Sequence, residues 1–119
     1  MTKDYDLSII KNLDNDPLFL VSLLDLFLVS SEEDVELLEH YVKNENWKGI
    51  KDTVHKMRSR VQHFKMQKLM DQLKNIEAQC QTGLFDSNFN SYIVDTIAYI
   101  KKILIAVKKD YLNLKKAEQ

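Results

Sequence analysis

The clearest potential for chemistry lies in the stretch from Val54 to Phe64, VHKMRSRVQHF. It sets His55 beside a lysine and two arginines, and neighbouring cations disfavour a protonated imidazole. A neutral ring keeps one nitrogen free to act as a nucleophile, and the same cations would stabilise a phosphoryl group attached to it. Two interpretations follow: a phosphoryl-accepting histidine, or an ordinary solvated one, which is the interpretation we give to His40 and His63.

A helical wheel puts His55 on the solvent side of its helix. At about 100° per residue, the ring lies about 140° from the centre of the apolar stripe. Gln62 falls within about 20° of His55, and Ser59 and Lys51 fall within about 40°. Arg58 lies about 60° to one side, one turn along the helix. The small side chain of Ser59 leaves room for a partner to approach the imidazole.

Other chemistries leave no signal in the sequence. There is no glycine-rich phosphate loop, and no histidine or cysteine motif has metal-ligand spacing, so we expect no metal and no cofactor. The single cysteine, Cys80, falls on an apolar stripe and is expected to be a buried, reduced thiol. The acidic residues Glu32, Glu33 and Asp34 are interpreted as a solvated helix face.

Composition predicts one all-helical domain. The chain has 119 residues, of which 45% are hydrophobic, with only two glycines and one proline. The net charge of −1 predicts no attraction to nucleic acid or to an anionic membrane. Residues 1–46 hold three lysines and eleven acidic residues, whereas residues 47–119 hold fourteen lysines and arginines and seven acidic residues. We expect these halves to pack together; the alternative is an acidic partner for the basic half.

No segment predicts a membrane span. The most hydrophobic run, Leu18 to Val29, is interrupted by Ser22 and Asp25 and is too short to cross a bilayer. The first residues, MTKDYDLS, lack an apolar signal region. We therefore expect a cytoplasmic protein, and we expect it to be a monomer.

Start and stop signals divide the chain into five helices. Asp6 could cap a short helix over about 6–13, and Asp16-Pro17 predicts the start of a long one over about 17–44. Asn46 can cap a helix over about 47–64, and Gly83 can end the next, over about 66–82. A last helix is expected over about 88–115.

The apolar residues of these helices recur every three or four positions. They are Ile50, Val54, Met57, Val61 and Phe64; Leu69, Leu73, Ile76 and Cys80; and Ile93, Ile97, Ile100, Leu104, Val107, Tyr111 and Leu114. Regular stripes of this kind predict helices packed side by side around one core. The expected fold is an all-α antiparallel four-helix bundle with a short additional N-terminal helix, in a single domain over 1–119.

The segment HKMRSRVQHFKM resembles the signature of histidine-containing phosphotransfer (HPt) domains, in which H-x-x-K-[GS]-S precedes an apolar-glycine pair at a turn. YDLSIIKNL followed by NDPLFLVSLLDLF is similar to the first two helices of that family. NENWKGIKDTVHKM is similar to its approach to the histidine. The likeness covers nearly the whole chain.

The resemblance implies that His55 is phosphorylated at Nε2 in a two-component phosphorelay. Arg58 takes the position of the family lysine, and it would offset the phosphate charge together with Lys56 and Lys51. Ser59 takes the small-residue position that lets a receiver aspartate approach, with Gln62 beside it. Family docking surfaces also use apolar residues of the first two helices, whose best matches are Ile10, Phe19 and Leu23; the alternative for each is core packing.

The implied mechanism is that of a carrier rather than an enzyme. A receiver domain, in a response regulator or a hybrid histidine kinase, would donate the phosphoryl group of its aspartyl phosphate to His55, and a second receiver would accept it. The Mg²⁺ of the reaction would belong to the receiver. Two residues depart from the family pattern: Arg60 replaces a small side chain, and Lys65 replaces the glycine of the turn, at a cost if its φ is positive. Both could alter the choice of receiver.

Two other functions remain open. The chain could be a degenerate HPt-like module that binds receivers or other proteins without carrying phosphate, which Arg60 and Lys65 would favour. It could also be the dimerisation and phosphoacceptor part of a sensor kinase, although it lacks an ATP-binding domain.

Overall fold

The computed structural model describes residues 17–117 as four long helices and one 3₁₀ turn. The helices are α2 (Pro17–Lys43), α3 (Trp47–Val61), α4 (Gln67–Thr82) and α5 (Ser87–Ala117), and the turn η1 (Gln62–Phe64) follows α3 directly. The predicted helix over 6–13, with Ile10, and the Asp16 cap lie outside the described residues. Each predicted bundle helix is present, and the prediction erred by at most three residues at an end, where η1 replaces the last turn of α3.

Local chemistry accounts for the helix ends. The Asn46 side chain accepts a hydrogen bond from the Gly49 N–H at 2.9 Å, which caps α3 as predicted. Gly83 ends α4 in the left-handed conformation with φ 75°, also as predicted. Lys65 adopts φ 50° and ψ 43° between η1 and α4, so the residue that replaces the family glycine does occupy a positive-φ position.

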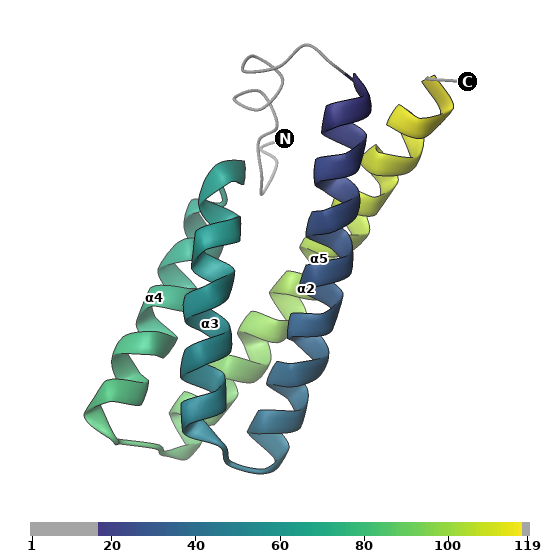
Figure 1. Cartoon of the computed structure of the whole chain (residues 1–119). Coiled ribbons are helices and arrows are strands. Elements are labelled where there is room, and N and C mark those ends of the chain that lie inside the picture. The colour runs from purple at the N-terminus through teal and green to yellow at the C-terminus, as the bar shows by residue number, and fades with distance from the viewer. Residues whose placement is uncertain (1–16, 118–119) are drawn as a thin grey trace.

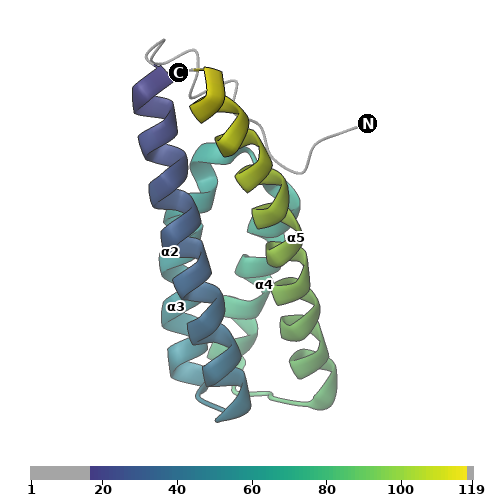
Figure 2. The ribbon, with the colours of Figure 1, turned by 90° about the vertical axis from the view of Figure 1, so that its right-hand side faces the viewer.

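The four helices form one bundle around a common apolar core. Successive helices run in opposite directions, with α2 and α5 in one layer and α3 and α4 in the other (Figures 1 and 2). The predicted stripe of α3 and η1 is fully buried, as are the central residues of α4 and α5; Cys80, Tyr111 and Leu114 are only partly buried. Burial of these stripes is the main favourable contribution to folding.

A close approach between α2 and α3 fixes the position of the helix that carries His55. Gly49 lies against the ring of Tyr41, and a Cβ at that position would come within 2.8 Å of the ring carbons. Near the other end of α3, the rings of Phe27 and Phe64 lie with their centroids 4.6 Å apart. The two contacts set both the distance and the register of α3 against α2.

Candidate functional site

His55 lies on the outward side of α3, away from the core. Its neighbour Val54 is completely buried, whereas the His55 side chain is 70% exposed. The orientation predicted from the helical wheel is therefore confirmed. Because α3 is held by the core stripe, the imidazole projects from a rigid support.

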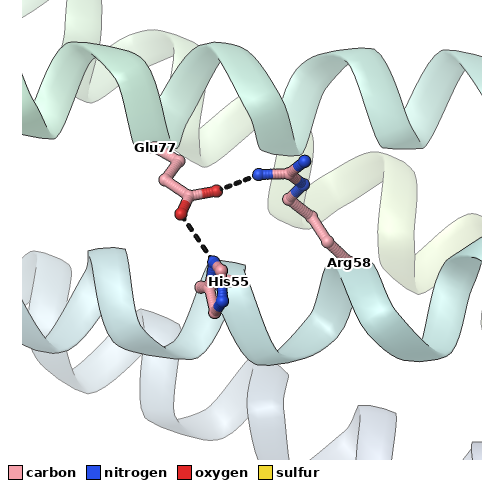
Figure 3. A network of polar contacts seen from close by, with 3 residues as sticks. All are labelled: His55, Arg58 and Glu77. Carbon is pink, nitrogen blue, oxygen red and sulfur yellow. Dashed lines mark hydrogen bonds and ion pairs between the residues drawn. The ribbon is translucent and has the colours of Figure 1, made fainter.

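Glu77 of α4 faces His55 across the α3–α4 interface, and sequence reasoning did not identify it. Its Oε1 lies 2.7 Å from Nδ1 of His55, and its Oε2 accepts a hydrogen bond from the Arg58 guanidinium (Figure 3). Burial raises the pKa of Glu77, but the hydrogen bonds and charges of Arg58 and His55 outweigh it and leave that pKa below its ordinary value. Glu77 is therefore an ionised carboxylate at neutral pH.

An ionised carboxylate can only accept hydrogen bonds, so Nδ1 of His55 carries the proton. In the neutral ring the other nitrogen, Nε2, then keeps its lone pair, and it lies on the side of the ring away from Glu77 (Figure 3). One carboxylate thus orients the imidazole, selects its tautomer and holds Arg58 nearby. This is the same relation by which a buried carboxylate orients a histidine base in hydrolytic triads.

The cations of the stretch divide between two carboxylates. Arg58 bonds to Glu77, whereas Arg60 bonds to Asp34 of α2, and the Lys56 ammonium lies 3.6 Å from Asp34 Oδ1. Asp34 is 2% exposed, so its interpretation as part of a solvated face is wrong; Glu32 and Glu33 are exposed as expected. A buried carboxylate is retained here because two cations compensate its desolvation.

Lys51 lies one helical turn before His55 and is partly buried. Its charge acts on the half-buried Cys80 of α4: burial raises the pKa of the Cys80 thiol, the Lys51 charge opposes this rise, and the Glu77 charge adds to it. Lys51, Glu77 and Cys80 therefore lie on the α3–α4 side of the site, where Lys51 supplies positive charge.

The predicted docking residues lie at two levels of the bundle. Ser59 and Gln62 are exposed on the outward side of α3, next to His55 in the helical order. Phe19 is 47% exposed, and Leu23 is partly buried against the core. The pairing of Phe27 with Phe64 and of Asp34 with Arg60 places Leu23 roughly 20–24 Å, and Phe19 roughly 25–30 Å, from the level of His55 along the helix axes. Only a partner that spans this length could contact both levels.

No group of three or more histidine, cysteine, aspartate or glutamate side chains within residues 17–117 could hold a metal ion. None of the described helices is long and apolar enough to cross a membrane. We refer to His55, Glu77 and Arg58 as the candidate reactive set, because Glu77 contacts the other two across the α3–α4 interface.

Comparison with known proteins identifies the family of the chain. The family model of the Hpt domain matches residues 22–107, a range that includes His55, Arg58, Glu77 and Asp34. A search of curated proteins and a search of solved structures gave no match. Hpt domains are phosphocarrier modules of two-component phosphorelays that interact with receiver domains. The chain belongs to the Hpt domain family.

Proposed function

We propose that this chain carries a phosphoryl group on Nε2 of His55, which it accepts from a receiver aspartate and passes to a second receiver. The observation that carries the proposal is the 2.7 Å contact between Glu77 and Nδ1 of an exposed imidazole. This contact leaves the lone pair of Nε2 directed away from the protein. A nucleophile in that state needs no general base to remove a proton before it attacks.

In the transfer step, no group on this chain gains or loses a proton, and one bond to phosphorus replaces another. The Nε2 lone pair forms a bond to phosphorus, and the bond from phosphorus to the receiver carboxylate oxygen breaks, so the receiver regains an aspartate. The ring, still protonated at Nδ1, acquires positive charge as the bond forms. Glu77 stabilises that charge across 2.7 Å, because the carboxylate is already directed at the ring on which the charge develops. Transfer of the phosphoryl group from His55 to the aspartate of a second receiver follows the same steps in reverse.

Arg58 supplies the nearest compensating charge for the phosphoryl oxygens. Its side chain is 33% exposed and Glu77 fixes the guanidinium, which offers five N–H donors in all. Lys51 adds charge from the preceding turn. Lys56 lies near Asp34, but its side chain is 59% exposed. Its ammonium is therefore accessible to a partner that docks at His55. The Mg²⁺ of the reaction is bound by the receiver and not by this chain.

Label transfer from a phosphorylated receiver tests the proposal. The wild-type chain should acquire an acid-labile, base-stable phosphate, and His55→Gln should acquire none while keeping its helical circular dichroism spectrum. His63→Gln is the matched control, because His63 is also exposed and lies eight residues further along. It should take label at the wild-type rate.

Two outcomes would overturn the proposal. Label on His55→Gln would place the phosphoacceptor elsewhere. A wild-type chain that binds receivers but takes no label from a panel of them would instead indicate an interaction module that does not carry phosphate.

A further inference from the structure

Helix α5 carries a second regular stripe on its outer side, in addition to the buried one. Its positions recur at spacings of four and three, the pattern of a helix that packs against another helix. All are exposed, and Ile105 is 74% exposed. The stripe consists of Val94, Ala98, Lys101, Ile105, Lys108, Leu112 and Lys115.

Helix α2 carries a matching outer stripe of opposite charge. It has the same alternating spacing, and all of its positions are exposed. Four of them are carboxylates, and Val29, between Asp25 and Glu32, is 48% exposed. The stripe consists of Ser22, Asp25, Val29, Glu32, Glu36, Glu39 and Lys43.

The two stripes lie side by side on the outer face of the α2–α5 layer, which Figure 2 shows from the front. The Lys101 ammonium lies 3.2 Å from Glu39, and the Tyr111 hydroxyl donates to Asp25 at 3.1 Å. An open groove of about 330 Å³ runs between the helices, lined in part by Val42, Val94 and Ala98. His55 projects from the opposite layer, so a partner on this face would leave His55 open.

We propose that this α2–α5 face binds the same face of a second copy of the chain. A two-fold axis parallel to the helices places α2 of each copy over α5 of the other, which is the self-complementary arrangement of a closed dimer. Carboxylates such as Glu32 and Glu36 then face lysines such as Lys101 and Lys108, while Val29 meets the apolar residues Ile105 and Leu112 of the α5 stripe. A two-fold axis perpendicular to the helices would instead oppose α2 to α2 and acid to acid. Charge therefore selects one arrangement, and the proposed dimer differs from the monomer expected from the sequence.

The size of the face suits a stable dimer. With 27 residues, α2 is about 40 Å long, and two neighbouring helices are roughly 20 Å wide. The face therefore offers roughly 800 Å² per copy, which is the area of a standard specific interface. Along this face the apolar residues of the α5 stripe, such as Ile105 and Leu112, alternate with the lysines that would pair with carboxylates of the other copy.

Sedimentation equilibrium over a concentration series at low salt tests the dimer. The wild-type chain should approach twice its monomer mass of 14.0 kDa, and Ile105→Lys should raise the dissociation constant at least tenfold. Leu84→Lys is the matched control, since Leu84 is an aliphatic side chain of similar exposure, 68%, outside this face. It should dimerise like wild type.

Charge reversal distinguishes pairing between copies from pairing within one copy. One variant carries Glu32→Lys and Glu36→Lys, and the other carries Lys101→Glu and Lys108→Glu. Each alone should be monomeric, because α2 and α5 of its two copies then carry like charges, and the equimolar mixture should form a heterodimer. A wild-type chain that stays monomeric, an Ile105→Lys variant that behaves like Leu84→Lys, or a mixture that stays monomeric would each overturn the proposal.

Discussion

Replacement of Glu77 by glutamine is the most direct probe of the candidate reactive set, because it removes one charge and keeps the shape of the side chain. The amide oxygen can still accept from Nδ1 of His55, but it cannot stabilise a developing positive charge as a carboxylate does. Glutamine also presents an NH₂ group, which can turn toward Nδ1 and favour the wrong tautomer. The expected consequences are slower transfer and a mixed tautomer of His55.

The structure sets the size of this effect. A hydrogen bond to a charged group contributes about 1.5–3 kcal/mol, roughly twice a neutral one. The His55 side chain is 70% exposed, so solvent screens the pair and we take the lower limit, about 1.5 kcal/mol. Because about 1.4 kcal/mol corresponds to a factor of ten in rate, transfer to Glu77→Gln should be about tenfold slower.

Single-turnover transfer should be measured with two donors, a phosphorylated receiver and a small-molecule phosphoryl donor that needs no docking surface. Nitrogen-15 spectra of the imidazole report the tautomer directly. Asp34→Asn is the matched control, because it makes the same change at a buried carboxylate on the other flank of α3. It should keep both the rate and the tautomer of wild type under conditions in which it is folded.

The reasoning would be refuted by a Glu77→Gln variant that keeps the wild-type rate with both donors and the wild-type tautomer. A rate that falls only with the receiver donor would also contradict it, since Glu77 would then act on docking rather than on the imidazole.

Three further predictions concern stability. The pKa of Glu77 is lower in the folded state than its ordinary value of 4.5. Ionised Glu77 therefore stabilises the fold at any pH above 4.5, and this stabilisation is lost as the pH falls through the lower pKa of the folded state. In urea titrations, the difference in free energy of unfolding between wild type and Glu77→Gln should be largest at neutral pH and should shrink in acid. A difference that grows in acid would contradict this. Asp34→Asn should lower the free energy of unfolding by about 2–3 kcal/mol, less than for a fully buried pair because Lys56 and Arg60 are partly in water. An unchanged urea midpoint would show that the pair contributes nothing. Lys65→Gly should raise stability by about 0.5–1 kcal/mol, because relief of the positive φ of 50° exceeds the extra entropy of glycine in the unfolded chain. A lower melting temperature for this variant would mean that contacts of the Lys65 side chain outweigh the strain.

Much of the fold could be predicted because its signals are local. The spacing of Ile50, Val54, Met57 and Val61 determines which side of α3 is apolar, and burial of that side follows in any bundle. The Asn46 cap and the Gly83 stop act within one helical turn, so they too were readable. The same periodicity placed His55 on the outward side.

Two acidic residues were misread or missed because their partners are distant in sequence. Asp34 lies 26 residues from Arg60, and Glu77 lies 22 residues from His55. A signal was present in both cases: Glu77 falls on the apolar stripe of α4 between Leu73 and Cys80, and Asp34 falls between Ser31 and Leu38 on the inner side of α2. An acidic residue on a buried stripe requires a cation or a hydrogen-bond donor nearby, although the stripe does not say which one.

The sequence by itself determined the helices, their inner faces and the outward direction of His55, because helical periodicity is a property of consecutive residues. Only the tertiary structure decided how the cations around His55 are used. The sequence argument took them all as neighbours of the imidazole, whereas packing assigns Arg58 to Glu77 and Lys56 and Arg60 to Asp34. The physical reason is that a buried carboxylate attracts whichever cation the helix packing brings within a few ångströms, and that distance does not exist until α2, α3 and α4 are assembled.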